Sequence, residues 1–372
     1  PYRLAVGQSL LVLYPEQTVT VQPGDTLTSI AASTGTDVAS LYRMNPNLSG
    51  SDRNYPGQIL VTQLEQAARR PAVVSGYAYP NVSERVLRGI LPYAGALAPF
   101  TYGFTPEGAL VPMDDERLLA LAGACGVQPL LHLSTLTAAG AFSAAQAAAL
   151  LRDPALQQTL AANVLQTMLE KGYEGLDVDF EYLGRDLAEP YAAFIQLLRD
   201  TLAPYSLPLI TALAPKTSAA QPGTLYEGHD YARVGAATDA VLLMTYEWGY
   251  TYGPPMAVAP LPNVRAVLDY AVTEIPAEKI LLGVPNYGYD WPLPFVSGET
   301  RAESLSPMQA VERALRHDIA IQYDAAAQAP YYHYTDRGGR EHAVWFEDAR
   351  SIEAKLRLAD EYHLQGVGYW NL

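Results

Sequence analysis

The sequence predicts an α/β protein: a (β/α)8 TIM barrel with an α+β insertion between strands 7 and 8, preceded by a small βααβ domain. From residue 72 onward, short apolar runs alternate with stretches of helical periodicity, as in a parallel sheet covered by helices. One run, at residues 174–182, carries an acid at every second position near its end. A separate strand–helix–helix–strand pattern occupies residues 15–64.

Composition argues against several classes of protein. The hydrophobic fraction of 49% is enough for a packed core, and the formal net charge of -15 argues against nucleic acid and against charge-driven binding to anionic membranes. Cys125 is the single cysteine and the six histidines show no paired ligand spacing, so we expect no metal site and no cofactor. No run approaches about 18 apolar residues, so no transmembrane helix is expected, and the oligomeric state is left open.

The first residues echo a later part of the chain. Residues 6–12 (Val-Gly-Gln-Ser-Leu-Leu-Val) repeat the pattern of residues 56–61 (Pro-Gly-Gln-Ile-Leu-Val). Residues 1–14 are therefore expected to be the C-terminal tail of a preceding repeat. The chain starts without Met and shows no targeting segment, so we expect it to be a fragment of a longer protein.

A first complete domain is expected over residues 15–64. Its elements in order are a strand at residues 17–21, a turn at 23–26, a helix from 27, a second helix from 38 to 44 and a strand at 59–61. Either Asp25 or Thr26 can cap the first helix and Asp37 can cap the second, because their side chains accept bonds from free amides.

This domain resembles the LysM family in the motifs at residues 21–27, 45–47 and 56–60. The resemblance implies binding to glycans that contain N-acetylglucosamine, either chitin or peptidoglycan. It places the glycan groove at Gly24, Asp25, Thr26, Ile30, Asn47 and Leu48. For Gly24 and Asp25, a purely structural role in the turn is an equal alternative.

The barrel is expected over residues 72–372, after a polar linker at residues 65–71. Its strands are expected at residues 72–77, 96–101, 128–134, 175–182, 207–212, 240–246, 280–285 and 366–370, with helical patterns between most of them, such as residues 114–123, 154–171 and 263–274. The long interval before the last strand contains the insertion, at about 295–347, with a capped helix from Ser306 and strands near 331–334 and 343–346.

Asp177, Asp179 and Glu181 alternate with three apolar residues in the fourth strand. Because a strand has a period of two, the carboxylates share one face and the apolar side chains share the other. Strands of parallel sheets are normally apolar on both faces, so buried acids are costly unless they pair or share protons. We therefore interpret the acids as functional, against the alternative of an edge strand with a solvated acidic face.

In barrels of this kind, chemistry gathers at the carboxyl ends of the strands. Glu181 is expected to end strand four and Tyr246 to end strand six. The other side chains assigned to substrate binding at this rim are Tyr77, Glu247, Trp248, Asn286, Tyr287 and Trp370. Carboxylates, phenols and indoles suit a carbohydrate, because aromatic rings cover sugar faces while polar groups bond to hydroxyls.

The run from Glu174 to Glu181 resembles the Asp-x-x-Asp-x-Asp-x-Glu signature of glycoside hydrolase family eighteen. Met244-Thr-Tyr246 is similar to the family's Met-x-Tyr motif, and Trp370 to its terminal tryptophan. The resemblance covers residues 72–372. Together with the LysM domain, it extends to the spore cortex-lytic N-acetylglucosaminidases of endospore-forming bacteria.

The resemblance implies cleavage of β-1,4 bonds after N-acetylglucosamine, with the substrate's own N-acetyl group as the nucleophile. Glu181 would protonate the leaving oxygen and then activate water, with a pKa raised by the charge of Asp179. Asp179 would accept the acetamido N–H, and Asp177 would exchange a proton with Asp179. Tyr246 would bond to the acetamido group, and Trp370 would form the floor of the subsite.

Two residues depart from the family pattern. Glu174 replaces the first aspartate of the signature, outside the inward register, and Glu247 stands where many members have aspartate, which puts the subsite geometry in doubt. The leading hypothesis is a hydrolase of peptidoglycan, acting on spore cortex fragments and located at the spore or cell wall outside the cytoplasm. The alternatives are a chitinase of the same mechanism and a non-catalytic glycan-binding protein, which the presence of Glu181 disfavours.

Overall fold

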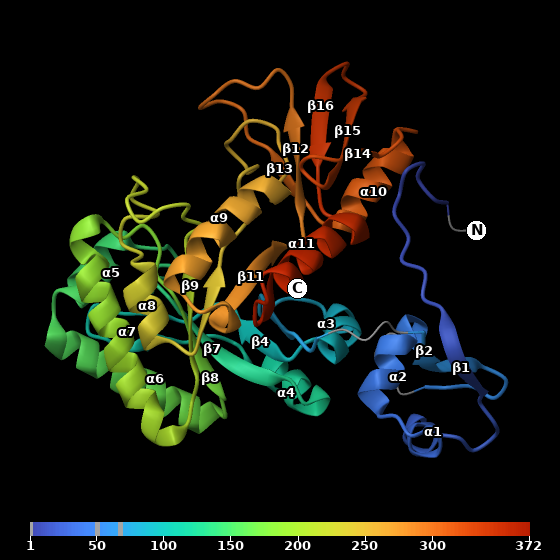
Figure 1. Cartoon of the computed structure of the whole chain (residues 1–372), viewed down its shortest axis with the longest axis horizontal. Helices are drawn as coiled ribbons and strands as arrows, with labels where there is room; N and C mark the ends of the chain where they lie inside the picture. Colours follow the sequence, from blue (N-terminus) through green and yellow to red (C-terminus); the bar gives the residue numbers. More distant parts are fainter. Residues whose placement is uncertain (1–2, 49–52, 66–69) are drawn as a thin grey trace.

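The structure, a computed structural model, describes residues 3–48, 53–65 and 70–372. Its centre is a closed barrel of parallel strands in which each strand pairs with the next along the chain and the last pairs with the first (Figure 1). The strands are β3 (Val73–Ala78), β4 (Ala96–Pro99), β7 (Gln128–Ser134), β8 (Gly175–Asp179), β9 (Leu209–Leu213), β10 (Ala240–Leu243), β11 (Ile280–Pro285) and β17 (Gly366–Trp370). This arrangement confirms the predicted (β/α)8 barrel.

Three of these strands end earlier than predicted, and one of them is β4, which ends at Pro99 instead of residue 101. β8 ends at Asp179 and β10 ends at Leu243, so Glu181 and Tyr246 lie in the loops that follow the strands. Side chains continue to alternate between the helix-covered face and the barrel interior past the last ladder hydrogen bond. The sequence pattern therefore overestimates the length of these strands. Both residues remain at the carboxyl rim of the barrel, where the prediction placed them.

Helices cover the outside of the barrel and bury its main hydrophobic core against the strands (Figure 1). They are α3 (Glu84–Ile90), α4 (Glu116–Cys125), α5 (Ala144–Leu151), α6 (Pro154–Lys171), α7 (Ala188–Leu202), α8 (Tyr231–Ala237), α9 (Leu261–Glu274) and α11 (Ala349–Glu361). Short 3-10 turns are η2 (Leu91–Tyr93), η3 (Arg185–Leu187), η4 (Ala203–Tyr205) and η5 (Ala277–Lys279), and a small hairpin joins β5 (Gly103–Phe104) to β6 (Leu110–Val111).

The ends of α6 show how local sequence fixes a helix. The side chain of Asp153 accepts hydrogen bonds from the amides of Ala155 and Leu156 at 2.9 and 3.1 Å, and Pro154 opens the helix without losing a bond. Gly172 ends it with a φ of 76°, a left-handed conformation that glycine adopts at little cost. These signals place α6 at the same bounds as the predicted helical segment.

The insertion forms an antiparallel sheet with one helix against it (Figure 1). Its elements are β12 (Gly288–Pro292), β13 (Glu303–Leu305), α10 (Pro307–Arg316), β14 (Gln322–Asp324), β15 (Ala329–Thr335) and β16 (Glu341–Trp345), in the sheet order β13-β12-β16-β15-β14. Ser306 caps α10 in a capping box, as its sequence predicts. The sheet begins at Gly288, ahead of the expected start near residue 295.

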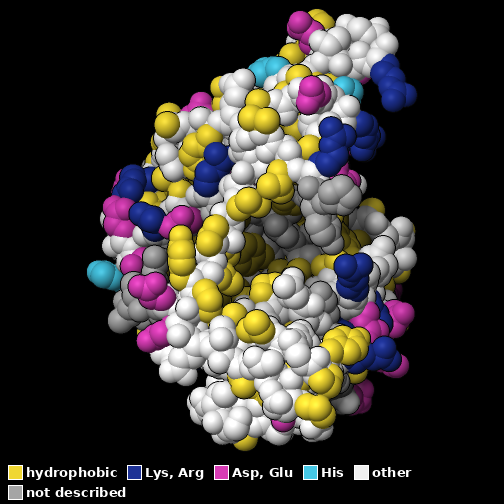
Figure 2. Space-filling view, turned by 90° about the vertical axis from the view of Figure 1, so that its right-hand side faces the viewer, with side chains coloured by type: hydrophobic (Ala, Val, Ile, Leu, Met, Phe, Trp, Pro, Cys, Tyr) yellow, Lys and Arg dark blue, Asp and Glu magenta, His cyan; other side chains and the backbone are white. Residues whose placement is uncertain are grey.

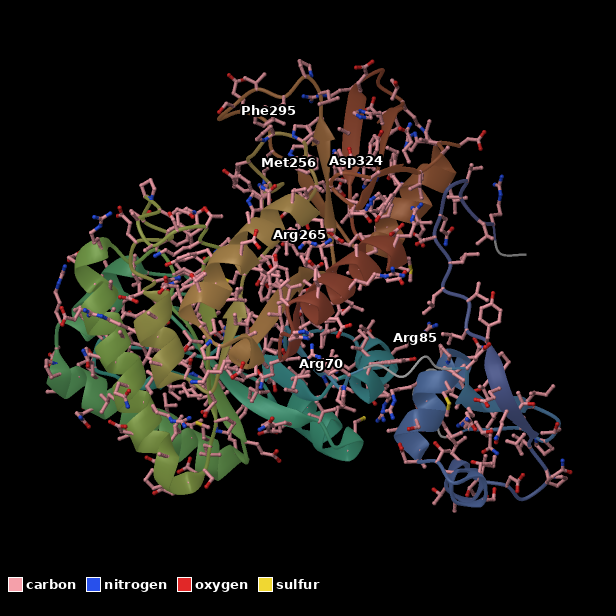
Figure 3. The ribbon with its side chains drawn as sticks, viewed as in Figure 1. Arg70, Arg85, Met256, Arg265, Phe295 and Asp324 are labelled. Atoms are coloured by element: carbon pink, nitrogen blue, oxygen red, sulfur yellow. The ribbon has the colours of Figure 1, made fainter. Side chains whose placement is uncertain are left out.

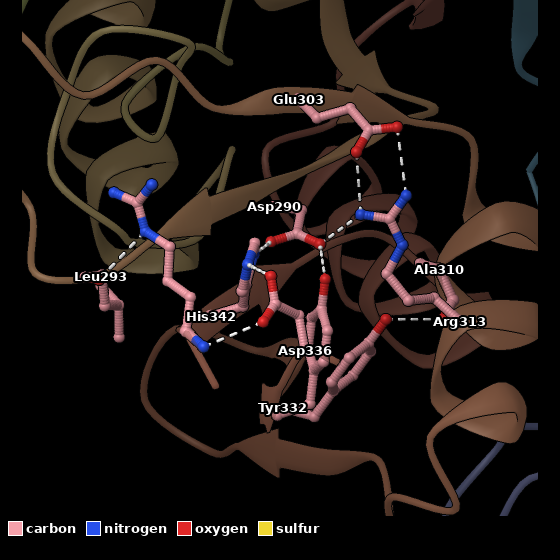
Figure 4. A network of polar contacts seen from close by, with 10 residues as sticks. Asp290, Leu293, Glu303, Ala310, Arg313, Tyr332, Asp336 and His342 are labelled. Atoms are coloured by element: carbon pink, nitrogen blue, oxygen red, sulfur yellow. Dashed lines mark hydrogen bonds and ion pairs between the residues drawn. The ribbon is translucent and has the colours of Figure 1, made fainter. Parts of the chain in front are cut away.

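A polar network holds this sheet to α10 (Figure 4). Asp290, on β12, is buried and accepts hydrogen bonds from Tyr334 at 2.7 Å and from His342 Nδ1 at 2.6 Å. Arg313, on α10, pairs with Asp290 and also with Glu303, at 3.0 and 3.1 Å. Because the buried carboxylate has partners on α10, β15 and β16, the network fixes how the helix sits on the sheet.

Side-chain bonds tie two barrel helices to each other and the loop after β10 to the insertion. Arg265 on α9, labelled in Figure 3, forms a bidentate pair with Glu361 on α11 at 2.6 and 2.8 Å. The loop after β10, which includes Met256, is held to β12 by the Trp291 indole, which donates to the carbonyl of Gly253 at 2.8 Å. The Trp291 bond holds the loop that carries Tyr246 against the insertion sheet.

The N-terminal domain has the predicted βααβ order. It consists of β1 (Pro15–Thr20), α1 (Leu27–Thr34), α2 (Val38–Met44), η1 (Pro46–Leu48) and β2 (Ile59–Leu64), with β1 and β2 antiparallel. Thr26, rather than Asp25, caps α1. The Asn45 side chain donates to Leu41 O and Val61 O and accepts from Val61 N at 2.8–2.9 Å, so this asparagine joins α2 to β2.

Residues 3–14 run from the insertion to β1 (Figure 1). Ala5 is buried in the insertion's hydrophobic cluster, and the carbonyl of Val6 accepts from the amide of Ile321 at 2.8 Å. Of the segment expected to be a repeat tail, residues 1–2 lie outside the described residues, as do residues 66–69 of the expected linker. Figure 2 shows the right-hand side of Figure 1 face-on, and on this side hydrophobic side chains gather around a hollow.

Candidate active site

The inward face of β8 carries the acids. β8 lies between β7 and β9, with Asp177 level with His132 and Asp179 level with Ser134 of β7. The intervening apolar side chains are fully buried in the core beneath the helices, which confirms the predicted alternation. Asp177 lines the barrel interior together with Tyr77, and Glu181 follows β8 by two residues. The strand therefore presents a column of carboxyl groups that rises from the barrel interior to its rim.

The two aspartates are protonated more readily than ordinary carboxyl groups. Burial raises the pKa of Asp177 to about 6, although a hydrogen bond from Tyr77 opposes the shift. Burial also raises the pKa of Asp179, and the charges of Glu181 and Asp177 raise it further. One oxygen of each aspartate, Oδ1, is buried with no hydrogen-bond partner among the described residues. The two buried Oδ1 atoms can each accept a hydrogen bond from a bound ligand.

Glu181 is partly buried, and its pKa is raised above the ordinary value of a glutamate. Burial is the main cause that raises its pKa, followed by the negative charge of Glu247. The sequence prediction named Asp179 as the source of this charge, but the structure gives that role to Glu247. Asp179 is itself buried, and its pKa is raised well above the ordinary value of an aspartate.

Two tyrosines of the insertion hold Glu247. Its Oε1 accepts hydrogen bonds from Tyr287 and, at 2.9 Å, from Tyr289. These bonds lower the pKa of Glu247, while burial, the larger cause, raises it. Glu247 adopts a φ of 68°, in the left-handed region that non-glycine residues rarely occupy, and such backbone is common at functional sites. Sequence reasoning missed Tyr289, because its approach depends on how the insertion folds back.

Tyr246 faces the same group of acids. Burial raises the pKa of its hydroxyl, and the charges of Asp179, Glu181 and Asp177 raise it further. The hydroxyl therefore stays protonated and can donate a hydrogen bond to a ligand. The ring also packs against Gly283, where an added Cβ would come within 2.9 Å of it, so β11 leaves room for the phenol.

An aromatic wall stands beside the acids. The Trp370 ring lies 5.6 Å from Tyr77, 4.7 Å from Phe100 and 6.0 Å from Tyr79, between ring centroids. Phe100 in turn lies 6.2 Å from Phe142, whose side chain is 60% exposed. Phe142, Phe100 and Tyr79 were not predicted, although Phe100 and Tyr79 lie at the ends of predicted strands. The wall offers flat apolar surfaces from the barrel interior out to solvent.

His132 is a further residue of the site that sequence reasoning missed. Its Nε2 lies 3.7 Å from Asp179 Oδ2, and its Nδ1 lies 2.6 Å from the Thr101 hydroxyl. Burial lowers the pKa of His132 to about 3, so the ring is neutral beside Asp179. The signal available was a lone polar residue inside the apolar run 128–134.

Two of the predicted substrate-binding residues are engaged elsewhere. Asn286 donates from its backbone amide to Trp370 O at 2.9 Å and from Nδ2 to Asn371 O at 3.1 Å, so it holds the end of β17 in place. Trp248 is half-buried against the main core, and its amide donates to Val258 O at 3.0 Å. Both residues lie at the rim, where they shape the site through its backbone.

The residues expected to form the glycan groove of the N-terminal domain are also partly structural. Gly24 has a φ of 92° in the turn, and Asp25 Oδ2 accepts from the amide of Gln22 at 2.7 Å. Thr26 caps α1, and Ile30 and Leu48 are buried in the core of the domain. Of the six residues predicted to contact the glycan, Asn47 has an exposed side chain and no such structural role among the hydrogen bonds of the described residues.

The closed parallel barrel and its inward acids at the end of the fourth strand define a class of glycosidase. Residues 136–372 match the family of glycosyl hydrolases family 18, and residues 19–62 match the LysM domain. The chain belongs to the glycosyl hydrolase family 18 and carries a LysM domain at its N-terminal side.

Comparison with individual relatives indicates which members of the family this chain resembles. The cortical fragment-lytic enzyme of Bacillus subtilis (strain 168) is 41% identical over 312 residues, which cover 82% of this chain and 72% of the relative. The crystal structure of the Bacillus cereus spore cortex-lytic enzyme SleL matches with a TM-score of 0.82 and 36% identity, over 99% of this chain and 86% of that one. A chitinase from Chromobacterium violaceum matches at 0.75 and 27%, over 81% and 94%.

Proposed function

We propose that this chain hydrolyses β-1,4 bonds after N-acetylglucosamine in peptidoglycan, with spore cortex fragments as the substrate. The observation that carries the proposal is the buried column of Asp177, Asp179 and Glu181 beside the Trp370 wall, with a raised pKa on each acid. This arrangement suits family 18 chemistry, in which the substrate's N-acetyl group replaces a protein nucleophile.

In the proposed first step, Glu181 donates its proton to the glycosidic oxygen, and the bond from that oxygen to the anomeric carbon breaks. The acetamido carbonyl oxygen bonds to the anomeric carbon from the opposite face, which forms an oxazolinium ring. The Oδ1 of Asp179, which has no partner among the described residues, accepts a hydrogen bond from the acetamido N–H. Asp179 thereby offsets the positive charge that develops on the oxazolinium ring. Asp177 holds the shared proton when Asp179 becomes charged.

In the second step, the ionised Glu181 takes a proton from water, and the resulting oxygen attacks the anomeric carbon and opens the ring. The product keeps the β configuration, because two displacements occur at the same carbon. Tyr246 donates to the acetamido oxygen and so orients it for attack. The Trp370 ring covers the apolar face of the sugar in this subsite.

Support for the substrate comes from the relatives and from the LysM domain. The curated relative reported above is named a cortical fragment-lytic enzyme, and one of the matched crystal structures is of a spore cortex-lytic enzyme. By the same reasoning, we propose that the protein works at the spore or cell wall, outside the cytoplasm. A chitinase is the second candidate, favoured by the structural match to a bacterial chitinase.

No helix within the described ranges of the chain has the length and apolarity needed to cross a membrane.

The test is mass spectrometry of the products from spore cortex fragments, vegetative peptidoglycan and chitin oligomers, each with wild type and Glu181→Gln. Products from cortex that end in reducing N-acetylglucosamine, absent with the variant, would support the proposal. Cleavage of chitin oligomers alone would assign a chitinase. Silence on all three substrates would leave glycan binding as the function.

A further inference from the structure

A buried histidine behind the acids has no part in the steps above. His229 lies in the loop before α8 and is 0% exposed. Its ring bridges the ends of two neighbouring barrel strands. Nδ1 lies 2.9 Å from the amide nitrogen of Ala214, just after β9, and Nε2 lies 2.9 Å from the carbonyl oxygen of Phe180, just after β8. Phe180 directly precedes Glu181.

These two partners fix the protonation of the ring. A backbone amide can only donate, so Nδ1 must be the unprotonated acceptor for Ala214. A backbone carbonyl can only accept, so Nε2 must carry the proton that bonds to Phe180. Burial also lowers the pKa of His229 to about 4, so the neutral form with a single tautomer persists at neutral pH.

The Phe180 side chain is buried and stacks on Phe104, Tyr191 and Phe194, but no ladder among the described residues holds its carbonyl. The parallel pairing of β8 with β9 extends only to Val178 and Thr211, so the carbonyl of Phe180 lies beyond the described ladder. Immediately after Glu181, Tyr182 adopts a φ of 56°, and the chain turns sharply into the following loop. The carbonyl of the peptide between Phe180 and Glu181 is therefore held by the imidazole.

The other end of the bridge is anchored. The Tyr231 hydroxyl donates to Ala214 O at 2.5 Å and accepts from the Lys216 amide at 2.9 Å. The Lys216 ammonium donates to the carbonyl of His229 itself at 2.8 Å. The Tyr191 ring packs 5.8 Å from the imidazole, between centroids. His229 thus joins the braced segment after β9 to the carbonyl of Phe180, just after β8.

We propose that His229 is a positioning residue that orients the acid/base Glu181 through the Phe180 carbonyl. The inference rests on the proposed function, since it needs Glu181 to act on the glycosidic oxygen. An acid displaced by about 1 Å loses much of its rate without a comparable loss of substrate binding. The structure therefore assigns to His229 an effect on kcat and little effect on KM.

Two variants separate positioning from stability. His229→Gln places an amide N–H where Nε2 lies and keeps the donor to Phe180, but loses the acceptor for Ala214. His229→Asn places an oxygen where Nδ1 lies and keeps that acceptor, but loses the donor. Each variant removes one buried hydrogen bond and the ring, so the two make a matched pair for melting temperature.

The kinetics are measured on the glycan that wild type cleaves, beside Glu181→Gln. We expect the kcat of His229→Asn to fall at least about tenfold below that of His229→Gln, with KM changed less than about threefold. Equal kcat values in the two variants would overturn the inference while leaving the proposed function intact. An inactive wild type would overturn the proposed function, and the inference with it.

A second measurement uses the wild-type protein alone and needs no substrate. Nitrogen-15 NMR of the wild-type imidazole, assigned through its backbone, is expected to show a protonated Nε2 and an unprotonated Nδ1 at pH 6 to 8. An unprotonated Nε2 would show that the bridge to Phe180 is not formed, and an imidazolium in this range would show that Nδ1 does not accept from Ala214; either result would overturn the inference.

Discussion

The buried network around Asp290 gives a quantitative prediction for the insertion. Asp290→Asn keeps the size of the side chain but removes its charge, in a position where the carboxylate is 1% exposed. Removing one partner of a buried ion pair costs about 3–5 kcal/mol, because the other charge stays buried. Here Arg313 keeps its bonds to Glu303, which offset part of that cost. We therefore expect a loss of about 3 kcal/mol in the free energy of unfolding.

The matched control is Glu303→Gln, on the other side of the same arginine. Glu303 is 63% exposed, and an exposed ion pair contributes only about 0–1 kcal/mol. Urea unfolding followed by tryptophan fluorescence suits the test. Trp291 lies next to Asp290 on β12, and Trp345 lies on the paired strand β16. A loss below about 1 kcal/mol for Asp290→Asn, or equal losses in both variants, would refute the reasoning.

Three further predictions concern the site. In Glu247→Gln, the loss of a negative charge lowers the pKa of Glu181, so the alkaline fall in kcat begins at a lower pH than in wild type; an unchanged pH–rate profile would count against this. Phe142→Ala should raise KM by about threefold to tenfold with a small change in kcat, while Phe142→Tyr keeps the wild-type KM; a loss confined to kcat would remove Phe142 from the binding wall. The pKa of Asp177 rises from 3.8 to about 6 on folding, so the folded state binds this proton more tightly than the unfolded state. As the pH rises from about 4 to 6, wild type should therefore lose stability relative to Asp177→Asn. Melting temperatures whose difference does not change with pH would contradict this.

Local sequence signals were sufficient for most of the fold. The apolar runs mark all the barrel strands, and residues such as Asp153, Gly172 and Ser306 mark helix ends because their capping needs only nearby backbone. What local signals did not give is where pairing stops. Phe180 is as buried as the strand residues before it, so its periodicity continues past the end of β8. The same limit left open whether Asp25 or Thr26 caps α1.

The candidate site was predictable where one strand carries it and unpredictable where separate segments meet. Asp177 and Asp179 share a face of β8, which a period of two reveals directly. Tyr289 reaches Glu247 only because the insertion folds back over the loop after β10, and His229 reaches Phe180 only through the loop after β9. No spacing in the sequence encodes these distances, since they depend on tertiary packing.

The central claim is that the substrate's acetamido group acts as the nucleophile and that Glu181 serves as acid and base. The most direct measurement is proton NMR of the first product released from an N-acetylated oligomer that wild type cleaves, read before the anomers equilibrate. The account predicts the β anomer with wild type and no product with Glu181→Gln, which should keep its fold. An α anomer as the first product, or turnover by the variant, would contradict it.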